Sequence, residues 1–421
     1  MLPVSRDPGM ERVLREVVET LAPMDRTPCS PGERRAAEWL ASRLGAIDGV
    51  AVTLEDEPSW GTFPPTSTGV GLLGMTAAWL ALRRRRGAAA LFAIACISSL
   101  LDEAQNGPRV LRRLARRRRQ TVNVVASAGD PEAIETLVVI AHHDAPQTGL
   151  LFDQTLLRRA WERNPERLAR AKRSPPQWWI GLAAPIGALL TALSGRRTPA
   201  RAGLALGTLG TALVADVWRS ATVQGANDNL SGVAALVALA EMLAAERPAG
   251  VRVLLVSCGA EETLQDGIRA FIARHAERLP PERTTFVNVD TIGSPHLIML
   301  EGEGPIWMER YEGPWLRDLV ADTAARLQIP LERGFLARSS TDSVIPSRAG
   351  YPIATLVSLT DWRVPANYHL PSDVPENLDY GTVADAALLI RGLLGQLAER
   401  VPDRTGIAAG ASGSRDTTLS S

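Results

Sequence analysis

Residues 225–232, GANDNLSG, decide the fold, and Asp228 lies at their centre. Four other short stretches supply partners for this aspartate: 138–146 (VVIAHHDAP), 256–271 (VSCGAEETLQDGIRAF), 286–293 (FVNVDTIG) and 367–377 (NYHLPSDVPEN). Each ends or follows an apolar run typical of a buried strand, and each carries His, Asp or Glu. A carboxylate that can bridge two cations, flanked by four more ligand-type residues, indicates a two-metal hydrolytic site.

Composition narrows the possible partners. Lys+Arg and Asp+Glu both total 46, so the net charge is zero and we expect no nucleic-acid partner. The three cysteines have an odd count and no paired spacing, which argues against a disulfide framework and a cysteine zinc site.

The two ends of the chain carry no fold signal of their own. The first 25 residues are charged and lack a continuous apolar core, so we expect no cleavable signal peptide. Residues 402–421 are rich in Gly, Ser, Thr and Ala, and we expect them to be disordered.

Alternating strand and helix patterns follow from residue 222 onward, and they favour a three-layer α/β/α domain with a mixed, mostly parallel sheet. Near the N-terminus, Ser30 and Glu33 flank Pro31 as in a capping box that starts a helix. In open sheets of this class ligands collect at the carboxyl ends of the strands, where the five motifs fall.

Two apolar hairpins with arginine-rich tips interrupt this pattern. Residues 60–82 are uncharged and long enough to cross a ~30 Å hydrocarbon core, whereas 87–101 reach only about 22 Å. The second hairpin comprises 177–195 and 202–215. Five tryptophans lie near the ends of these runs, as in an interfacial belt: Trp60, Trp79, Trp178, Trp179 and Trp218. We therefore expect lipid contact through residues 60–101 and 177–215, and a membrane localisation.

Two aspects of the hairpins stay open. Because some of the runs are short, the hairpins could instead be buried helices of a large cap. The arginine tips favour a cytoplasmic tip, but the basic segment 109–119 argues equally for the opposite side. Between the hairpins, residues 150–172 read as one amphipathic, charged helix.

Each motif offers specific ligands. His142 and Asp144 lie on the same side of a strand, so Asp144 can orient the imidazole of His142. His143 is a rival ligand, although it faces away from Asp144. Asp228 could by itself be an ordinary helix N-cap. Of the adjacent Glu261 and Glu262, one can bind metal while the other transfers protons. The remaining candidates are Asp290 at a strand end and His369 in a proline-bounded loop.

The order of these motifs resembles the co-catalytic zinc aminopeptidases of clan MH, and most closely metallopeptidase family twenty-eight of the aminopeptidase Y and S type. The resemblance implies two Zn²⁺ per chain and a peptide substrate. It makes His142 and Asp290 ligands of one zinc, Glu262 and His369 ligands of the other, and Asp228 the bridge. It also implies that Glu261 is the general base, that Asp144 supports His142, and that Asp342 is structural.

The resemblance also divides the chain. The catalytic domain would comprise 1–58, 120–150 and 221–401. The first hairpin insertion would occupy 59–119, the amphipathic helix and second hairpin 151–220, and the tail 402–421. We expect a membrane-associated di-zinc exopeptidase, an aminopeptidase that uses metal-activated water. The alternatives are a glutaminyl cyclase-like enzyme with a single zinc, or a non-catalytic membrane scaffold. Oligomeric state, side-chain preference and the membrane face that bears the site stay open.

Overall fold

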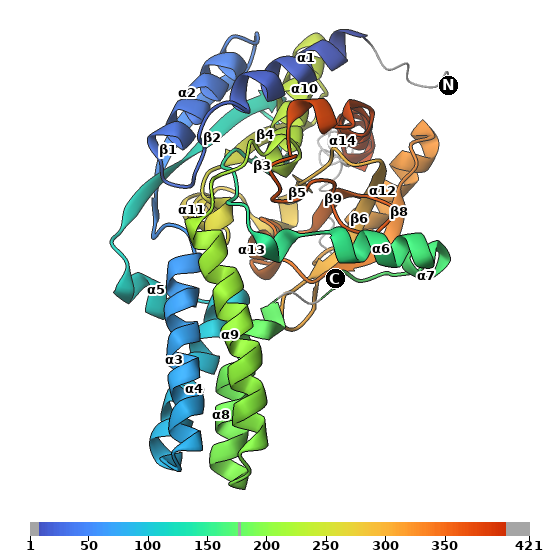
Figure 1. Cartoon of the computed structure of the whole chain (residues 1–421). Coiled ribbons are helices and arrows are strands. Elements are labelled where there is room, and N and C mark those ends of the chain that lie inside the picture. The colour runs from blue at the N-terminus through green and yellow to red at the C-terminus, as the bar shows by residue number, and fades with distance from the viewer. Residues whose placement is uncertain (1–7, 176–177, 401–421) are drawn as a thin grey trace, which may run out of the picture.

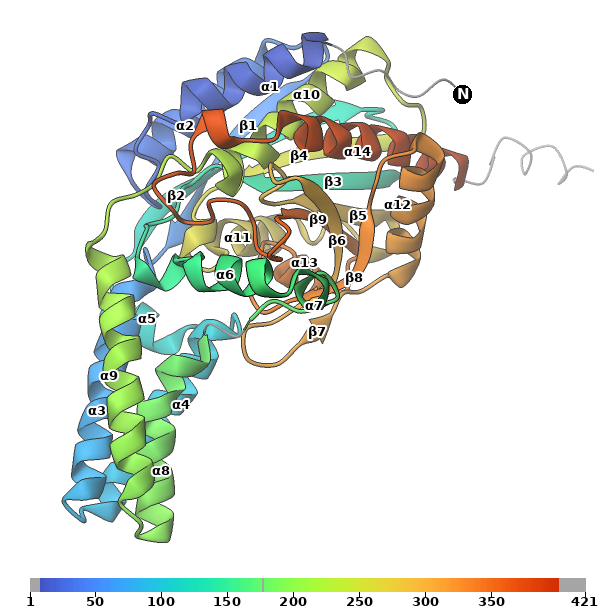
Figure 2. The same cartoon turned by 45° about the vertical axis from the view of Figure 1, so that its right-hand side comes forward.

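The computed structural model describes residues 8–175 and 178–400. Two parts are visible: a layered α/β part, and a bundle of four helices that extends away from it (Figures 1 and 2). The predicted disorder of residues 402–421 concerns residues outside the described ranges.

The α/β part is built on a nine-stranded sheet of order β1-β2-β4-β3-β5-β9-β6-β7, with β8 paired to β6. The central strands β4, β3, β5 and β9 are parallel, and antiparallel strands flank them. The strands are β1 (Ala51–Ser59), β2 (Arg119–Gly129), β3 (Glu135–His142), β4 (Val251–Cys258), β5 (Thr284–Val289), β6 (His296–Glu303), β7 (Glu309–Arg310), β8 (Glu332–Ala337) and β9 (Ile353–Leu359).

Helices cover both faces of this sheet, which confirms the predicted three-layer class. One face packs against α1 (Pro8–Leu21), α2 (Pro31–Gly45), α10 (Ser231–Ala245), α12 (Pro314–Leu327) and α14 (Tyr380–Arg400). The other face packs against α11 (Asp266–His275) and α13 (Val344–Arg348). Strand β3 shows the reason: Val139 belongs to the first apolar core and Val138 and Ile140 to the second, so the strand is buried on both sides.

The bundle consists of α3 (Pro64–Leu82), α4 (Arg86–Ala104), α8 (Ala183–Ser194) and α9 (Thr198–Arg219), with the short α5 (Val110–Ala115) at its base. Its interior is made of small side chains: Ala77, Ala78, Ala81, Ala89, Ala93, Ala188, Ala192 and Ala200. Its large apolar side chains are exposed: Leu72, Leu73, Trp79, Leu91, Phe92, Ile94, Ile186, Leu190, Leu193, Leu206, Leu209 and Trp218. A bundle in water buries such residues, so this distribution is inverted.

Three described helices are long and apolar enough to cross a membrane: α4, α9, and Ala226–Ala245 around α10. The third is 78% buried within the α/β part and belongs to its core. Helices α3 and α4 both contain 19 residues. The two helices therefore do not differ in length, contrary to what the uncharged runs 60–82 and 87–101 had suggested. Helix α3 begins only at Pro64, and α4 continues to Ala104.

Two local expectations also need correction. Residues 150–172 form a turn (Leu150–Phe152) followed by α6 (Thr155–Arg163) and α7 (Pro165–Ala169), because Pro165 ends the first helix and starts the second. Ser30 caps α2 as predicted, but the carboxylate of Glu33 does not close a capping box. It accepts hydrogen bonds from the backbone N–H of Cys29 and Ala260 and from the hydroxyl of Thr121.

A matched pair of alanine substitutions tests the close packing of α8 on α9. A Cβ at Gly203 would lie 2.5 Å from the carbonyl oxygen of Ala183, whereas a Cβ at Gly69 meets nothing within 4 Å. We expect Gly203→Ala to lower the free energy of unfolding by about 1–3 kcal/mol, because the helices must separate. Gly69→Ala should raise it by up to about 1 kcal/mol. Circular dichroism during denaturation in detergent measures both, and equal effects would contradict the packing.

Candidate metal centre

Three of the predicted site segments follow neighbouring parallel strands. His142 is the last residue of β3, Glu261 and Glu262 lie in a turn just after β4, and Asp290 follows β5. Because β4, β3 and β5 are adjacent and parallel, their carboxyl ends bring these side chains to one edge of the sheet.

The other two segments approach this edge from loops. Asp228 lies in the irregular turn Ala226–Leu230 that leads into α10, with φ −112° and ψ 90°. The side chain of Asn229 fixes this turn to the Asp290 segment, since it donates to the Val289 carbonyl at 2.9 Å and accepts from the Thr291 N–H at 3.1 Å. His369 lies in the loop after β9, with a positive φ of 55°.

The side chains form three groups of candidate ligands, two of which share Asp228. These two contain His142, Asp228 and Asp290, and Asp228, Glu262 and His369; the third contains His142, Glu261 and Glu262. In each group the candidate ligand atoms lie within 4.8 Å of one another. His142 Nε2 is 3.3 Å from Asp228 Oδ1, and His369 Nε2 is 3.1 Å from Asp228 Oδ2. The two carboxylate oxygens of Asp228 therefore face different histidines.

The donor atoms fit zinc. Among the described residues, Asp228 Oδ2 and His369 Nε2 have no hydrogen-bond partner, although both atoms are buried. Buried polar atoms are almost always paired, so two unpaired ligand atoms 3.1 Å apart are expected where a cation binds between them. Imidazole nitrogens and carboxylate oxygens are the ligands that Zn²⁺ takes in catalytic sites.

Asp144 connects two parts of the centre. Its Oδ1 lies 3.3 Å from Nδ1 of His142, in the relation predicted from the strand period. Its two oxygens also accept the backbone N–H groups of Glu261 and Glu262, each at 3.0 Å. The fully buried Asp144 carboxylate thus fixes the turn after β4 relative to the end of β3.

Burial and the neighbouring side chains shift the pKa values of Asp228 and Glu261 in opposite directions. Burial alone would raise the pKa of Asp228, but the imidazoles of His142 and His369, 3.3 and 3.1 Å away, hold it well below its ordinary value. Burial raises the pKa of Glu261 well above its ordinary value, although the charge of His142 opposes the shift. Glu261 also accepts a hydrogen bond from the Gln265 amide at 2.6 Å. Burial raises the pKa of the adjacent Glu262 in the same direction, so the Gln265 hydrogen bond, and not the pKa shift, distinguishes Glu261 from Glu262.

Asp373 is a supporting residue that the sequence reasoning missed. It is 1% exposed, and its oxygens accept the N–H groups of Asn227 at 2.7 Å and Asp228 at 3.1 Å. Its position four residues after His369, inside a motif already singled out, was the available signal. Phe152 was also missed: its ring lies 4.2 Å from that of His369, but it comes from a segment that was predicted as helix.

His143, the rival ligand, and Asp342, expected to be structural, lie outside the candidate ligand groups. His143 is fully buried, and its Nδ1 lies 2.9 Å from the hydroxyl of Ser257. Burial lowers its pKa to about 4, so it stays neutral. Asp342 is also buried beside the centre, and burial raises its pKa to about 8.

Comparison with known proteins finds a family match over part of the chain. The profile of Peptidase family M28 matches residues 209–394. No curated protein sequence matches the chain. The predicted family resemblance and the predicted enzyme class, a zinc-dependent exopeptidase acting on peptides, are confirmed.

Solved structures share the fold at low sequence identity. An aminopeptidase from Aneurinibacillus sp. strain AM-1 has a TM-score of 0.53 and 13% identity, covering 92% of this chain and 93% of its own. A leucine aminopeptidase precursor from Bacteroides thetaiotaomicron has a TM-score of 0.52 and 14% identity, and the match covers 91% of this chain and 96% of the precursor. A glutaminyl cyclase from the same organism, bound to N-acetylhistamine, has a TM-score of 0.52 and 13% identity, and the match covers 91% of this chain and 97% of the cyclase.

Substitution of Asp373 tests how the Asp228 turn is supported. In Asp373→Asn one oxygen is replaced by an NH₂ group facing a backbone N–H, so the turn that carries Asp228 should shift. We expect zinc affinity to fall by about 10–100-fold, as for other partners of ligand-bearing groups. Zinc titration with a competing chelator measures this. The control is Asp379→Asn in the same loop, where the aspartate caps the N–H of Thr382. Equal zinc affinity in both variants would contradict the assignment.

Proposed function

We propose that this chain, a member of peptidase family M28, is a membrane-associated di-zinc aminopeptidase that removes residues from the N-termini of peptides. The single observation that carries the proposal is the position of Asp228, whose two oxygens face His142 and His369 in two separate candidate ligand groups.

In this proposal His142 and Asp290 would hold one zinc, Glu262 and His369 would hold the other, and Asp228 would contribute to both sites. Zinc supplies a lowered pKa for a water molecule and polarises the scissile carbonyl. Asp144 keeps the imidazole of His142 in place, and it keeps Glu261 and Glu262 pointing in their different directions through their backbone N–H groups.

Glu261 moves the proton. Its carboxylate takes a proton from the attacking water and delivers it to the nitrogen of the leaving peptide, as a general base and then a general acid. Its raised pKa supports this role, because a carboxylate with an ordinary pKa holds a proton too weakly. The Gln265 amide, 2.6 Å from Glu261 Oε1, keeps the side chain directed at the centre.

The bundle anchors the enzyme in a bilayer. Small residues at the helix contacts and large apolar residues on the outside are typical of helices packed in lipid, because lipid solvates the large side chains and small ones allow close approach. Trp79 near the tip and Trp218 near the base are both about half exposed, as at two interfaces. Helix α9 contains 22 residues, or about 33 Å.

Glutaminyl cyclase activity with a single zinc is the second candidate, because cyclases share this fold. The two ligand groups around Asp228 favour the aminopeptidase. A membrane scaffold without catalytic activity is the third candidate, and its function would not require the carboxylate of Glu261.

Two conservative substitutions test the centre. Asp228→Asn removes the charge that two cations would share, so zinc content should fall from near two per chain and hydrolysis of aminoacyl-nitroanilides should be lost. Glu261→Gln should keep the zinc but lose at least about 100-fold in kcat, because only proton transfer is removed. Elemental analysis and initial rates in detergent measure both.

Several outcomes would contradict the proposal. Near one zinc in the wild type, together with cyclisation of N-terminal glutamine, would indicate the cyclase. A cellular function that survives Glu261→Gln would indicate the scaffold. No bound zinc, and no hydrolysis after zinc is supplied, would refute both enzyme readings.

Substitution of an exposed leucine by arginine tests the membrane anchor. Leu209 is half exposed near the middle of α9, so Leu209→Arg should place a charge in hydrocarbon at a cost of about 2.5–3.5 kcal/mol. The fraction of protein retained in membranes after alkaline carbonate extraction should fall. Ile134→Arg, at an equally exposed position on the α/β part, is the control and should leave retention unchanged. A wild-type protein that is fully released by carbonate would contradict the anchor.

A further inference from the structure

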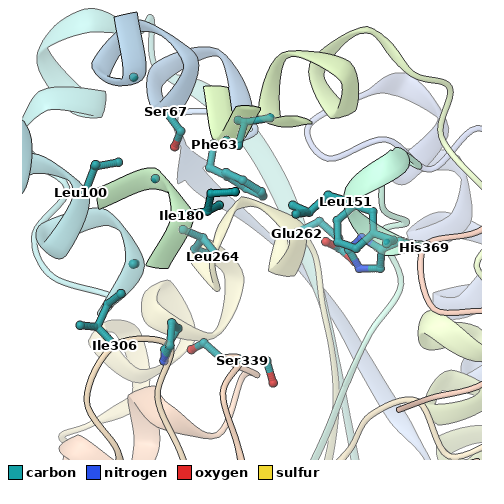
Figure 3. A pocket seen from close by; sticks show the side chains of 18 of the residues that line it. Phe63, Ser67, Leu100, Leu151, Ile180, Glu262, Leu264, Ile306, Ser339 and His369 are labelled. Atoms are coloured by element: carbon teal, nitrogen blue, oxygen red, sulfur yellow. The ribbon is translucent and has the colours of Figure 1, made fainter. Parts of the chain in front are cut away.

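A large hollow connects the candidate metal centre to the interior of the bundle. It encloses about 1170 Å³, part of it open to solvent. Figure 3 shows Glu262 and His369 at one end, Ser67 and Leu100 at the other, and Phe63, Ile180 and Leu264 between them. We refer to it as the bundle hollow.

About half of the residues that line the bundle hollow come from the two inserted hairpins. Ser67 and Gly71 belong to α3, Leu100 to α4, and Gly210 and Val214 to α9. The hollow therefore exists only where the bundle meets the catalytic turn that carries Glu261 and Glu262. A peptidase without these hairpins would lack this wall.

The bundle hollow reaches into the depth that lipid chains would occupy around the bundle. Gly71 lies about 10 Å from the start of α3, and Gly210 about 13 Å from the end of α9, both measured from the base of the bundle. One extended residue spans at most about 3.6 Å, so this depth suits about three residues of a peptide and is too great for one ordinary side chain.

Charge is restricted to one end of the bundle hollow. Its charged lining groups are Glu261 and Glu262, next to His369 at the metal centre, and the lining includes no lysine or arginine. At the other end the buried hydroxyl of Ser67 has no hydrogen-bond partner among the described residues. The hollow has no cationic side chain that could pair with a phosphate or a carboxylate, and its apolar wall can take apolar residues.

A second hollow lies on the other side of the centre. It is lined by His142, Asp228 and Asp290, and it shares Glu261, Glu262 and Tyr368 with the bundle hollow. Its far wall includes Phe335 and Leu359, and its volume is about 810 Å³. An exopeptidase needs room for a single residue before the scissile bond and for several residues after it. The bundle hollow, which extends between the helices away from the centre, suits the residues after the scissile bond, and the second hollow suits the residue before it.

We propose that the bundle hollow binds the apolar residues that follow the N-terminal residue of the substrate, so that the enzyme prefers peptides whose apolar segment partitions into the bilayer. This inference rests on the proposed aminopeptidase function and specifies its substrate class. The apolar segment reaches the centre along the bundle, and the N-terminal residue lies in the second hollow.

Two peptides with the same N-terminal residue test this substrate class. One has leucine followed by three leucines, and the other has leucine followed by three glycines, each with an amidated C-terminus. Release of the first leucine is measured in the same micelles by mass spectrometry. We expect kcat/KM to be at least about tenfold higher for the apolar peptide, because the hollow buries its side chains.

Variants separate the hollow from simple enrichment of apolar peptides in micelles. Ser67→Leu and Val214→Phe fill the hollow, and the first costs no hydrogen bond because the hydroxyl is unpaired. Both should bring the ratio of the two kcat/KM values close to one. Thr76→Leu is the matched control on α3: Thr76 is exposed and outside the hollow, so the ratio should match the wild type.

The outcomes are distinguishable. A wild type that cleaves both peptides equally well, or a high ratio that survives both filling variants, would overturn the inference and leave the aminopeptidase proposal intact. Failure of the zinc-loaded wild type to cleave either peptide would overturn the proposed function itself. A ratio lost equally in Thr76→Leu would also contradict a role for the hollow.

Discussion

The rest of the structure depends on how the Asp228 carboxylate is held between two histidines that come from distant parts of the chain. His142 lies at the end of a central strand, and His369 lies in a loop more than two hundred residues later. The backbone of Asp228 is fixed by Asp373, and the neighbouring Asn229 binds the end of β5. The fold therefore concentrates unpaired ligand atoms at one point, as expected of a site that binds a cation.

The bundle is joined to this centre by buried hydrogen bonds. Arg109 and Arg112, at its base, both donate to the carbonyl oxygen of Thr263, directly after the glutamate pair. Arg109 also forms an ion pair with Asp266 at 2.5 Å, and both partners are almost fully buried. Because breaking one partner of such a pair is costly, the bundle and the catalytic turn hold a fixed relative position. The bundle is thus part of the wall of the site.

The sequence predicted the fold class correctly, and it singled out residues that the structure brings together at one edge of the sheet, because strand ends and ligand types are local signals. It predicted Asp144 beside His142 from the strand period alone. It missed Asp373 and misassigned Glu33, because their carboxylates bind backbone N–H groups of distant segments, which no local pattern records. The break at Pro165 was visible in the sequence but was outweighed by the amphipathic pattern around it. The inverted packing of the bundle needed the structure, because a uniformly apolar helix does not show which face is inside.

The most direct test of the central claim is anomalous X-ray diffraction at the zinc edge from the zinc-loaded protein. The account predicts two peaks about 3.5–4 Å apart, one beside His142 and Asp290 and the other beside Glu262 and His369, with the Asp228 carboxylate between them. A single peak, or peaks that do not contact Asp228, would contradict it.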